Sequence, residues 1–439
     1  MIGHRVVRTR SDSPWVLGTA LLFVTMAAVV GIAVAAQDAE GVRAAGVIAI
    51  VTLVTLVIFR LAIRDDPHGA WLFRVLVASL ILKFGAVVFR LWFVLVQYGG
   101  VADALQYHES GERLADAILR SGLPQMDKYY STQLVQLLTG IYYAFVGPTL
   151  VGAFVFWAWL GLMGMLFFYK AFTVAFPGGN RRLYALLILL YPSMLLWTSS
   201  LGKDALVCFS LGLMTYGAAI VMRRPDFRGW LMAAGGLAGV LFIRPHVAAM
   251  AGVALATGYL LRPIRAGLMT PVVKGMATAI VAVLAFVVVQ TSADFIQLEE
   301  LSGEGVLSYI EARQETTARG RSIIQRGMPN NPVALADGIA TVFFRPYPWE
   351  AGNLFAQISA AEGVLLVALV AWRRRSVIAA IVGARRDTFL LMSVTYVLLF
   401  AFFFSAISNF AIIARQRAQL LPFILMWLAY LPARSGPRA

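Results

Sequence analysis

The chain has 439 residues, of which 60% are hydrophobic and 13% are charged, and its mean hydropathy is +0.77. This composition excludes an ordinary soluble domain and is typical of a protein with many membrane spans. The formal net charge of +15 would suggest a nucleic-acid partner in a soluble protein. Here most basic residues flank apolar runs, where they anchor spans, so we expect membrane lipids as partners and no nucleic acid.

Apolar runs long enough for a membrane-crossing helix recur along the whole chain. They predict an all-α fold, a polytopic transmembrane helix bundle of about 12 spans with outward-facing loops and interfacial helices. The expected spans are residues 15–36, 44–63, 70–97, 150–175, 183–198, 205–222, 229–243, 247–261, 273–290, 354–372, 388–405 and 418–432.

The positions of the basic residues predict the orientation of these spans. Arg5, Arg8 and Arg10 precede the first span and place the N-terminus in the cytoplasm. With that start, each turn expected inside carries Lys or Arg, beginning with Arg60 and Arg64. Both termini are then cytoplasmic, in an integral protein of the plasma (inner) membrane whose active face is extracytoplasmic.

Residues 131–147 form one apolar run that breaks this alternation if it spans the membrane. The run carries Gln133 and Gln136 and ends at Gly147, before a proline. Counting it as a span would move the next group of basic residues to the outside, against the positive-inside rule. We therefore expect an interfacial or re-entrant helix on the outer face, with a thirteenth span as the alternative.

The loops on the outer face divide the chain into five regions. These are the N-terminal spans (1–97), an outer loop with interfacial helices (98–149), a central transmembrane bundle (150–290), a long outer loop (291–353) and the C-terminal spans (354–439). Chemistry in a multi-span protein usually occurs where polar groups gather between spans, so the outer loops and turns are where we expect the site.

Basic residues also occur on the outer side, which the chain otherwise keeps poor in Lys and Arg. They are Lys203, Arg244, Arg345, Arg415 and Arg417. A charge beside hydrocarbon needs a compensating group, and the positive-inside rule does not account for these residues. We therefore expect an anionic ligand, because arginine pairs hold phosphate well.

Two short outer turns contain some of these basic residues. Lys203 and Asp204 begin a helix, whose N-terminus and lysine can together hold a phosphate. The alternative is that Lys203 extends to the interface and Asp204 only starts the helix. Arg244 and His246 flank a proline in another tight turn, and we count both as substrate-binding candidates.

The first outer loop carries titratable side chains directly after a span. Asp103 precedes Tyr107 by about one helical turn, which places both on one face, and His108 follows. A carboxylate at the interface can take a proton from an acceptor hydroxyl. Asp103 is thus the candidate catalytic base, with Tyr107 and His108 as substrate-binding residues; a helix N-cap is the alternative for Asp103.

The long outer loop closes with an aromatic segment that has a charged pair. Arg345, Tyr347, Trp349 and Glu350 lie within six residues, and their rings suit either a sugar or a membrane-interface belt. No HExxH motif occurs, and four histidines with one cysteine offer no zinc site. We assign no metal ligand and no certain cofactor, and leave a divalent metal open.

These pieces together resemble the GT-C membrane glycosyltransferases of the protein-mannosyltransferase and aminoarabinose-transferase kind, and the related bacterial polysaccharide polymerases. The resemblance rests on Asp103 in the first outer loop, the non-spanning run 131–147, the turn from Ser200 to Ala205, and the basic stretch from Arg415 to Phe423. It covers most of the chain as architecture, whereas each motif is short.

The resemblance implies a glycosyltransferase that uses a polyprenyl-phosphate-linked sugar donor and a glycan, lipid or protein acceptor in cell-envelope polysaccharide assembly. The resemblance also implies roles for residues of this chain. The donor phosphate would be bound by Arg415, Arg417, Arg244 and Lys203. Asp103 would be the base, and the sugar or acceptor cleft would be lined by Arg345, Tyr347 and Trp349. A transporter or flippase of a lipid-linked glycan, or a non-catalytic assembly subunit, is the alternative.

Overall fold

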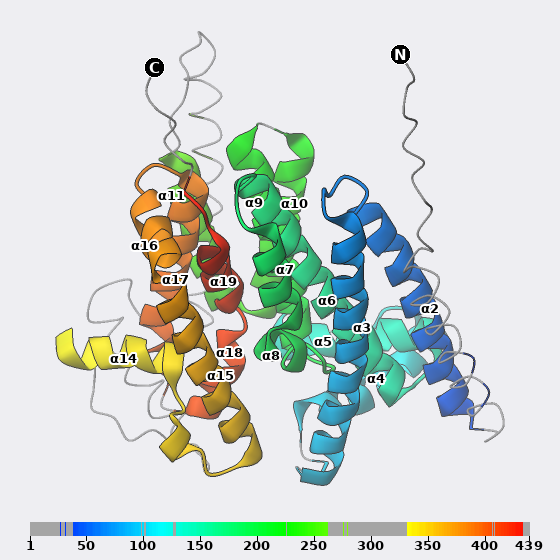
Figure 1. Cartoon of the computed structure of the whole chain (residues 1–439). Helices are drawn as coiled ribbons and strands as arrows, with labels where there is room; N and C mark the ends of the chain where they lie inside the picture. Colours follow the sequence, from blue (N-terminus) through cyan, green and yellow to red (C-terminus); the bar gives the residue numbers. More distant parts are fainter. Residues whose placement is uncertain are drawn as a thin grey trace, which may run out of the picture.

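The computed structural model describes residues 38–261 and 332–432, except 98, 101, 126–128, 225, 406 and 408, together with the single positions 27, 31, 275 and 279. Every regular element among these residues is helical, which confirms the all-α prediction for this part of the chain (Figure 1). The expected spans 15–36 and 273–290, and most of the long outer loop 291–353, lie outside the described residues.

The described helices follow one another through short connections. In chain order they are α2 (Ala39–Ala62), α3 (Gly69–Trp92), η1 (Phe93–Gln97), α4 (Asp103–Ser121), α5 (Ser131–Val146), α6 (Leu150–Ala175), α7 (Arg181–Leu190), α8 (Pro192–Leu196), α9 (Lys203–Arg223), α10 (Phe227–Ile243), α11 (Pro245–Leu260), α14 (Pro332–Phe344), η2 (Pro348–Glu350), α15 (Leu354–Trp372), α16 (Arg374–Gly383), α17 (Thr388–Phe404), α18 (Phe410–Arg417) and α19 (Leu421–Ala429).

Five of these helices are long and apolar enough to cross a membrane, which fits an integral membrane protein. They are α2, α3 with its continuation η1, α6, α9 and α15. A sixth candidate is the pair α16 and α17, which is bent by 106°. The other expected spans within the described ranges are shorter helices; α10 has 17 residues, α11 has 16 and α19 has nine.

The expected span 183–198 is two helices, α7 and α8, for a local reason. Pro192 occupies the first position of α8, where its missing N–H costs nothing, but its ring disfavours helical geometry in the residue before it. Tyr191 is accordingly extended, with φ −67° and ψ 132°. The break turns the chain toward the polar segment that precedes α9.

Helix α9 lies between α6 and α10 and is fixed there by glycines. A Cβ atom on Gly212 would lie 2.4 Å from the carbonyl oxygen of Gly164 in α6. A Cβ atom on Gly236 in α10 would lie 2.3 Å from the backbone nitrogen of Met214 in α9. Small residues let membrane helices approach this closely, so the start of α9 has a defined position in the bundle.

The basic turns gather at one end of the bundle. Arg223 at the end of α9 donates to Asp387 before α17 over 2.7 Å, and Arg182 lies 3.3 Å from His68. We call this the basic end, made of residues 60–68, 170–182, 223–228 and 373–387. Helices α3 and α10 run from it to the opposite end, where α9, α11 and α15 begin (Figure 1).

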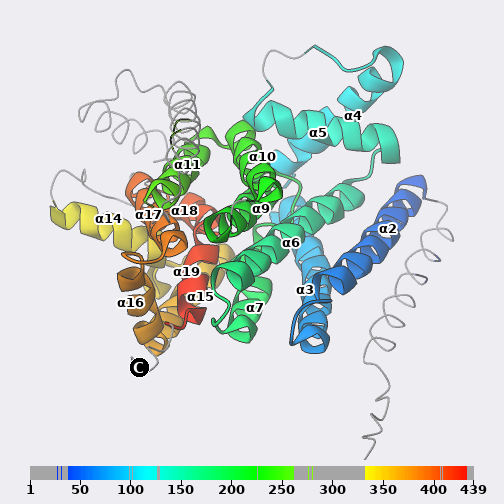
Figure 2. The same cartoon turned by 90° about the horizontal axis from the view of Figure 1, so that it is seen from above.

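Helices α4 and α5 pack side by side at that opposite end (Figure 2). A Cβ atom on Gly140 of α5 would lie 2.6 Å from the Cβ of Leu114 in α4, so the two helices are in close contact. Helix α5 has 16 residues and is not among the helices long enough to cross a membrane. Whether residues 131–147 form an interfacial helix or a thirteenth span stays a prediction, because α11, an expected span, also has 16 residues.

Candidate functional site

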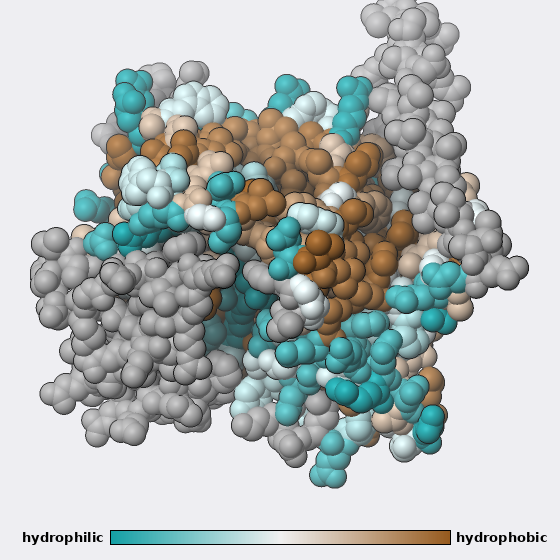
Figure 3. All heavy atoms as spheres, turned by 90° about the horizontal axis from the view of Figure 1, so that it is seen from below, coloured by the Kyte–Doolittle hydropathy of each residue, from teal (hydrophilic) through white to brown (hydrophobic). Residues whose placement is uncertain are grey.

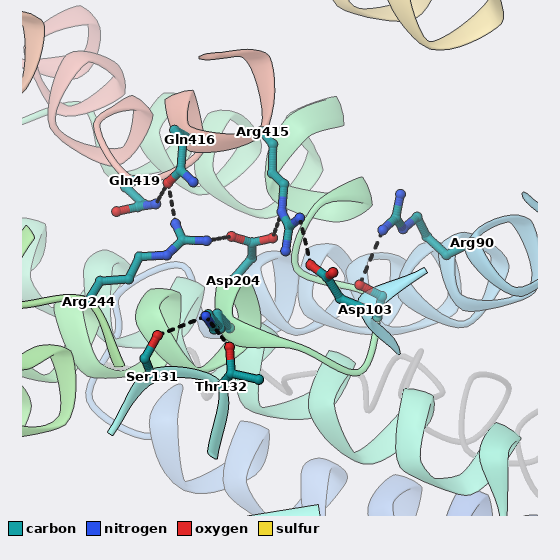
Figure 4. A network of polar contacts seen from close by, with 11 residues as sticks. Arg90, Asp103, Ser131, Thr132, Asp204, Arg244, Arg415, Gln416 and Gln419 are labelled. Carbon is teal, nitrogen blue, oxygen red and sulfur yellow. Dashed lines mark hydrogen bonds and ion pairs between the residues drawn. The ribbon is translucent and has the colours of Figure 1, made fainter. Parts of the chain in front are cut away.

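Asp204 is the centre of a buried ionic network at the end opposite the basic end. Arg244 donates from Nη2 to one carboxylate oxygen over 2.7 Å, and Arg415 donates from Nε to the other. The two guanidinium groups reach the carboxylate from opposite sides (Figure 4). Only 7% of the side chain of Asp204 is exposed, and the same holds for Arg244. We call the part of the molecule around Asp204 the network end.

Local sequence places each of these three residues at a helix terminus. Asp204 lies in the first turn of α9, where a carboxylate interacts favourably with the helix dipole. Arg244 is the residue before Pro245, which begins α11 at a position that suits proline. Arg415 lies in the last turn of α18, a favourable place for a cation, and Asn409 caps the start of that helix.

Polar side chains extend the network on both sides of Asp204. The Nη1 atom of Arg415 lies 3.7 Å from Oδ2 of Asp103, whose side chain is 63% exposed. On the other side, Nη1 of Arg244 donates to Oε1 of Gln416, which also accepts from Gln419. Asp103 is therefore the carboxylate of the network that faces solvent.

Two further cations border the network. Nζ of Lys203 donates to Ser131 and Thr132 at the start of α5, over 2.9 Å in both cases. Arg90 in α3 donates from Nη2 to Oγ of Ser200 over 3.4 Å. Asp204 is within electrostatic range of Arg90, and Lys203 of Arg244.

The network carries more positive than negative charge. Its four cations are Arg90, Lys203, Arg244 and Arg415, and its two carboxylates are Asp103 and Asp204. Among the described residues, Lys203, Arg244 and Arg415 alone outnumber the two carboxylates by one positive charge. Such an excess in a partly buried site favours an anionic ligand.

Tyr107 lies against this network, whereas its neighbour His108 belongs to a different contact. Tyr107 is 2% exposed, and burial, followed by the charge of Asp103, raises the pKa of its phenol, which stays neutral at physiological pH. His108 lies 2.6 Å from the hydroxyl of Tyr143 and 3.5 Å from Glu112. Tyr107, which the sequence places on one helix face with Asp103, thus borders the network, whereas His108 contacts α5.

Arg417 and Arg345 form a second cluster, beside α14. Arg417 is 1% exposed and donates to the carbonyl oxygens of Val342 and Arg345, at the end of α14. Arg345 lies 3.1 Å from Glu350 through its Nε atom. Arg417 thus holds backbone carbonyls in this structure, unlike Arg415 two residues earlier.

The aromatic segment after Arg345 is ordered by the same pair. Glu350 also accepts from the backbone nitrogen of Tyr347 over 3.0 Å, and the peptide bond from Arg345 to Pro346 is cis. The rings of Tyr347 and Trp349 stack with centroids 5.0 Å apart, and Trp349 is 81% exposed. His246 lies elsewhere, with its ring 6.0 Å from that of Phe404.

A cavity of about 660 Å³ lies between the two clusters. Arg90 belongs to both the cavity wall and the network, and Glu350 to both the wall and the second cluster. Seen from the network end, hydrophilic residues line part of a hollow near the centre of the molecule (Figure 3). Its size is within the usual range for ligand sites, roughly 300–1,000 Å³.

Some residues of the site were not singled out from the sequence. Arg90, Gln416 and Gln419 join the network, and Glu362, 5% exposed in α15, accepts a hydrogen bond from Ser193 before α9. Arg90 and Glu362 were visible as charges within apolar runs, which is itself a signal for a functional site.

Within residues 38–261 and 332–432, no group of three or more His, Cys, Asp or Glu residues is arranged to hold a metal ion. Comparisons with protein-family models, curated proteins and solved structures found no match to this chain. The geometry of the network and the cavity is therefore the basis for interpreting the site.

Proposed function

We propose that the chain is a membrane glycosyltransferase that takes its sugar from a polyprenyl-phosphate-linked donor at the extracytoplasmic face, in the assembly of a cell-envelope glycan. The excess of positive charge that Lys203, Arg244 and Arg415 create around Asp204 carries this proposal. A lipid phosphate combines an anion with a hydrocarbon tail, and both find suitable surroundings where a cationic network meets apolar helices.

The proposed topology has about 12 spans with both termini in the cytoplasm. The basic end then faces the cytoplasm, in keeping with the positive-inside rule. The network end faces outward, where a lipid-linked donor meets its acceptor. Lys203, Arg244 and Arg415 hold the donor phosphate, and Asp204 keeps two of these cations in place through its two oxygens. Arg417 supports the site through the end of α14.

The two carboxylates of the network have different roles in this reaction. Asp204 is buried and accepts from a guanidinium at each oxygen, whereas Asp103 is exposed and has one contact at 3.7 Å. Asp103 therefore accepts the proton of the acceptor hydroxyl while the hydroxyl oxygen attacks the anomeric carbon of the donor sugar. The bond from that carbon to the phosphate oxygen breaks, and the cations stabilise the negative charge on the released lipid phosphate.

The test is transfer by purified protein in liposomes that contain a polyprenyl-phosphate-linked hexose and a lipid acceptor. Asp103→Asn should reduce the transfer rate at least about 100-fold because a general base typically contributes that much. Asp116→Asn is the matched control, since Asp116 is an exposed carboxylate on the same helix, α4. Unchanged transfer by Asp103→Asn would show that Asp103 is not the base.

A transporter of a lipid-linked glycan would use the same cations and is the alternative. It predicts that the lipid moves between the leaflets of the same liposomes without formation of a new glycosidic bond. In the structure, Lys83, which is 1% exposed, donates to the carbonyl oxygen of Met194 at the end of α8 over 3.1 Å. This contact fixes the helix break before the network, which favours a built site over a transport path.

A further inference from the structure

The cavity between the network and the second cluster has a wall of mixed chemistry. Its polar wall residues include Arg90, Gln97, Glu350, Asn353 and Ser359. Its aromatic residues are Phe93, Trp197 and Phe355, and the Trp197 and Phe355 rings lie 5.4 Å apart at an angle of 29°. A ligand with many hydroxyl groups can form hydrogen bonds with such a wall, whereas a hydrocarbon chain cannot.

The cavity adjoins the proposed phosphate site directly. Arg90 lines the cavity and donates to Ser200, which lies three residues before Lys203. From α18, Ala414 lines the cavity and the next residue, Arg415, binds Asp204. In a glycosyl phosphate only one oxygen separates the sugar from phosphorus, so the sugar must lie in space that borders the phosphate.

We propose that this cavity binds the carbohydrate group of the lipid-linked donor, and this inference rests on the proposed function. Trp197 and Phe355 give the cavity an apolar wall beside Arg90, whose guanidinium lies 5.4 and 5.7 Å from their ring centroids, and Asn353, Gln97 and Ser359 bind the hydroxyl groups of the sugar. Arg90 carries positive charge from the network into the cavity and orients the junction between phosphate and sugar.

A polar wall of this kind also determines sugar specificity. A site built to bind a hydroxyl discriminates strongly against a ligand that lacks it, because its own polar group is then left unpaired. Glu350 is held by Arg345 and by the backbone of Tyr347, so its position in the wall is fixed. The segment from Arg345 to Asn353 thus takes part in sugar recognition because it holds Glu350 at a fixed position in the cavity wall.

The experiment compares binding of four probes to the full chain in nanodiscs. They are a short polyprenyl monophosphate and the same lipid phosphate carrying a hexose, a pentose or an N-acetylhexosamine. We expect at least one glycosylated probe to bind at least tenfold more tightly than the bare lipid phosphate. Ser359→Leu, which adds volume inside the cavity, should remove this difference while affinity for the bare probe stays within twofold.

Two further variants separate loss of the cavity from damage to the fold. Ala361→Leu adds the same kind of side chain on an exposed position of α15 and should keep the full preference for sugar. Ala411→Leu fills the cavity from α18, at a position exposed enough to accept it, and should act like Ser359→Leu.

The outcomes distinguish this inference from the proposed function. Equal binding of all four probes by the natural chain, or a sugar preference that survives both cavity-filling variants, would overturn the carbohydrate site and leave the phosphate site intact. If the cavity-filling variants weaken binding of the bare and the glycosylated probes equally, the cavity binds the lipid phosphate itself, against the inference. Failure of every probe to bind would overturn the proposed function together with this inference.

Discussion

The two ends of the bundle carry the same kinds of charged residue in opposite environments. At the basic end, the side chains of Arg223 and Arg224 are 42% and 76% exposed, and each pairs with a nearby aspartate. At the network end, the side chains of Arg244 and Asp204 are both 7% exposed, and that of Arg415 is 30% exposed. The burial of these arginines therefore distinguishes the two ends.

This difference in burial separates charged residues that anchor helices in the membrane from charged residues that form a binding site. Exposed ion pairs contribute only about 0–1 kcal/mol, so we expect the residues of the basic end to matter for orientation in the membrane rather than for stability. A buried carboxylate between two guanidinium groups is different, because removing one member leaves uncompensated charge away from water. Such an arrangement persists only with precise geometry, and it leaves the network with excess positive charge for a ligand.

Removing the central carboxylate should give the largest effect on stability. Asp204→Asn replaces a charge that neutralises two guanidinium groups, so we expect the free energy of unfolding to fall by about 3–5 kcal/mol. Denaturant titration in detergent micelles measures this change. Arg224→Gln, at the exposed pair of the basic end, is the control and should change stability by less than about 1 kcal/mol. Equal effects at the two ends would remove the distinction between them.

A substitution among the proposed phosphate-binding cations Lys203, Arg244 and Arg415 should affect ligand affinity more than stability. Arg415→Gln removes a cation that the proposed ligand contacts, and we expect affinity for a polyprenyl monophosphate to fall by about 10- to 100-fold, the loss of about 1.5–3 kcal/mol for a charged hydrogen bond. Arg228→Gln at the basic end removes the same charge from an exposed position and should leave affinity unchanged. If both variants bind equally weakly, net charge rather than the network attracts the lipid.

Much of the network end was predictable because the positions of basic residues along the chain indicate which turns lie on the same side of the membrane. The distribution of basic turns placed Asp103, Lys203, Asp204, Arg244 and Arg415 on one side, and the structure brings these five into one network. The pairing itself was not predictable. Which guanidinium reaches Asp204 depends on how helices pack in three dimensions, and no local spacing encodes it.

Other parts were misjudged from the sequence for identifiable reasons. The run 183–198 was expected to be one span because average hydropathy hides a single proline, although Pro192 already indicates a break. Arg90 is a charge inside an apolar run, but only the structure shows that it reaches Ser200 and the cavity. Arg417 was grouped with Arg415 because they are two residues apart, and the structure assigns it to the carbonyls of α14.

The smallest expected effect tests how the middle of α9 supports the network end. Gly212→Ala would place a Cβ atom 2.4 Å from the carbonyl oxygen of Gly164, so we expect α9 and α6 to separate slightly and unfolding free energy to fall by about 1–3 kcal/mol. The control is Gly235→Ala in α10, where a Cβ atom meets nothing within 4 Å. It should be neutral or stabilising by up to about 1 kcal/mol because alanine favours a helix.

The same two variants also test whether packing in the middle of α9 affects the contacts at its two ends. A shift of α9 at Gly212 moves Asp204 relative to Arg244 and Arg415, so affinity for a polyprenyl monophosphate should fall about threefold or more. The exposed pair of Arg223 and Asp387 at the other end of α9 tolerates such a shift, because long exposed side chains can follow it. If Gly212→Ala lowers stability but leaves affinity unchanged, the network keeps its own geometry and does not depend on the packing of α9.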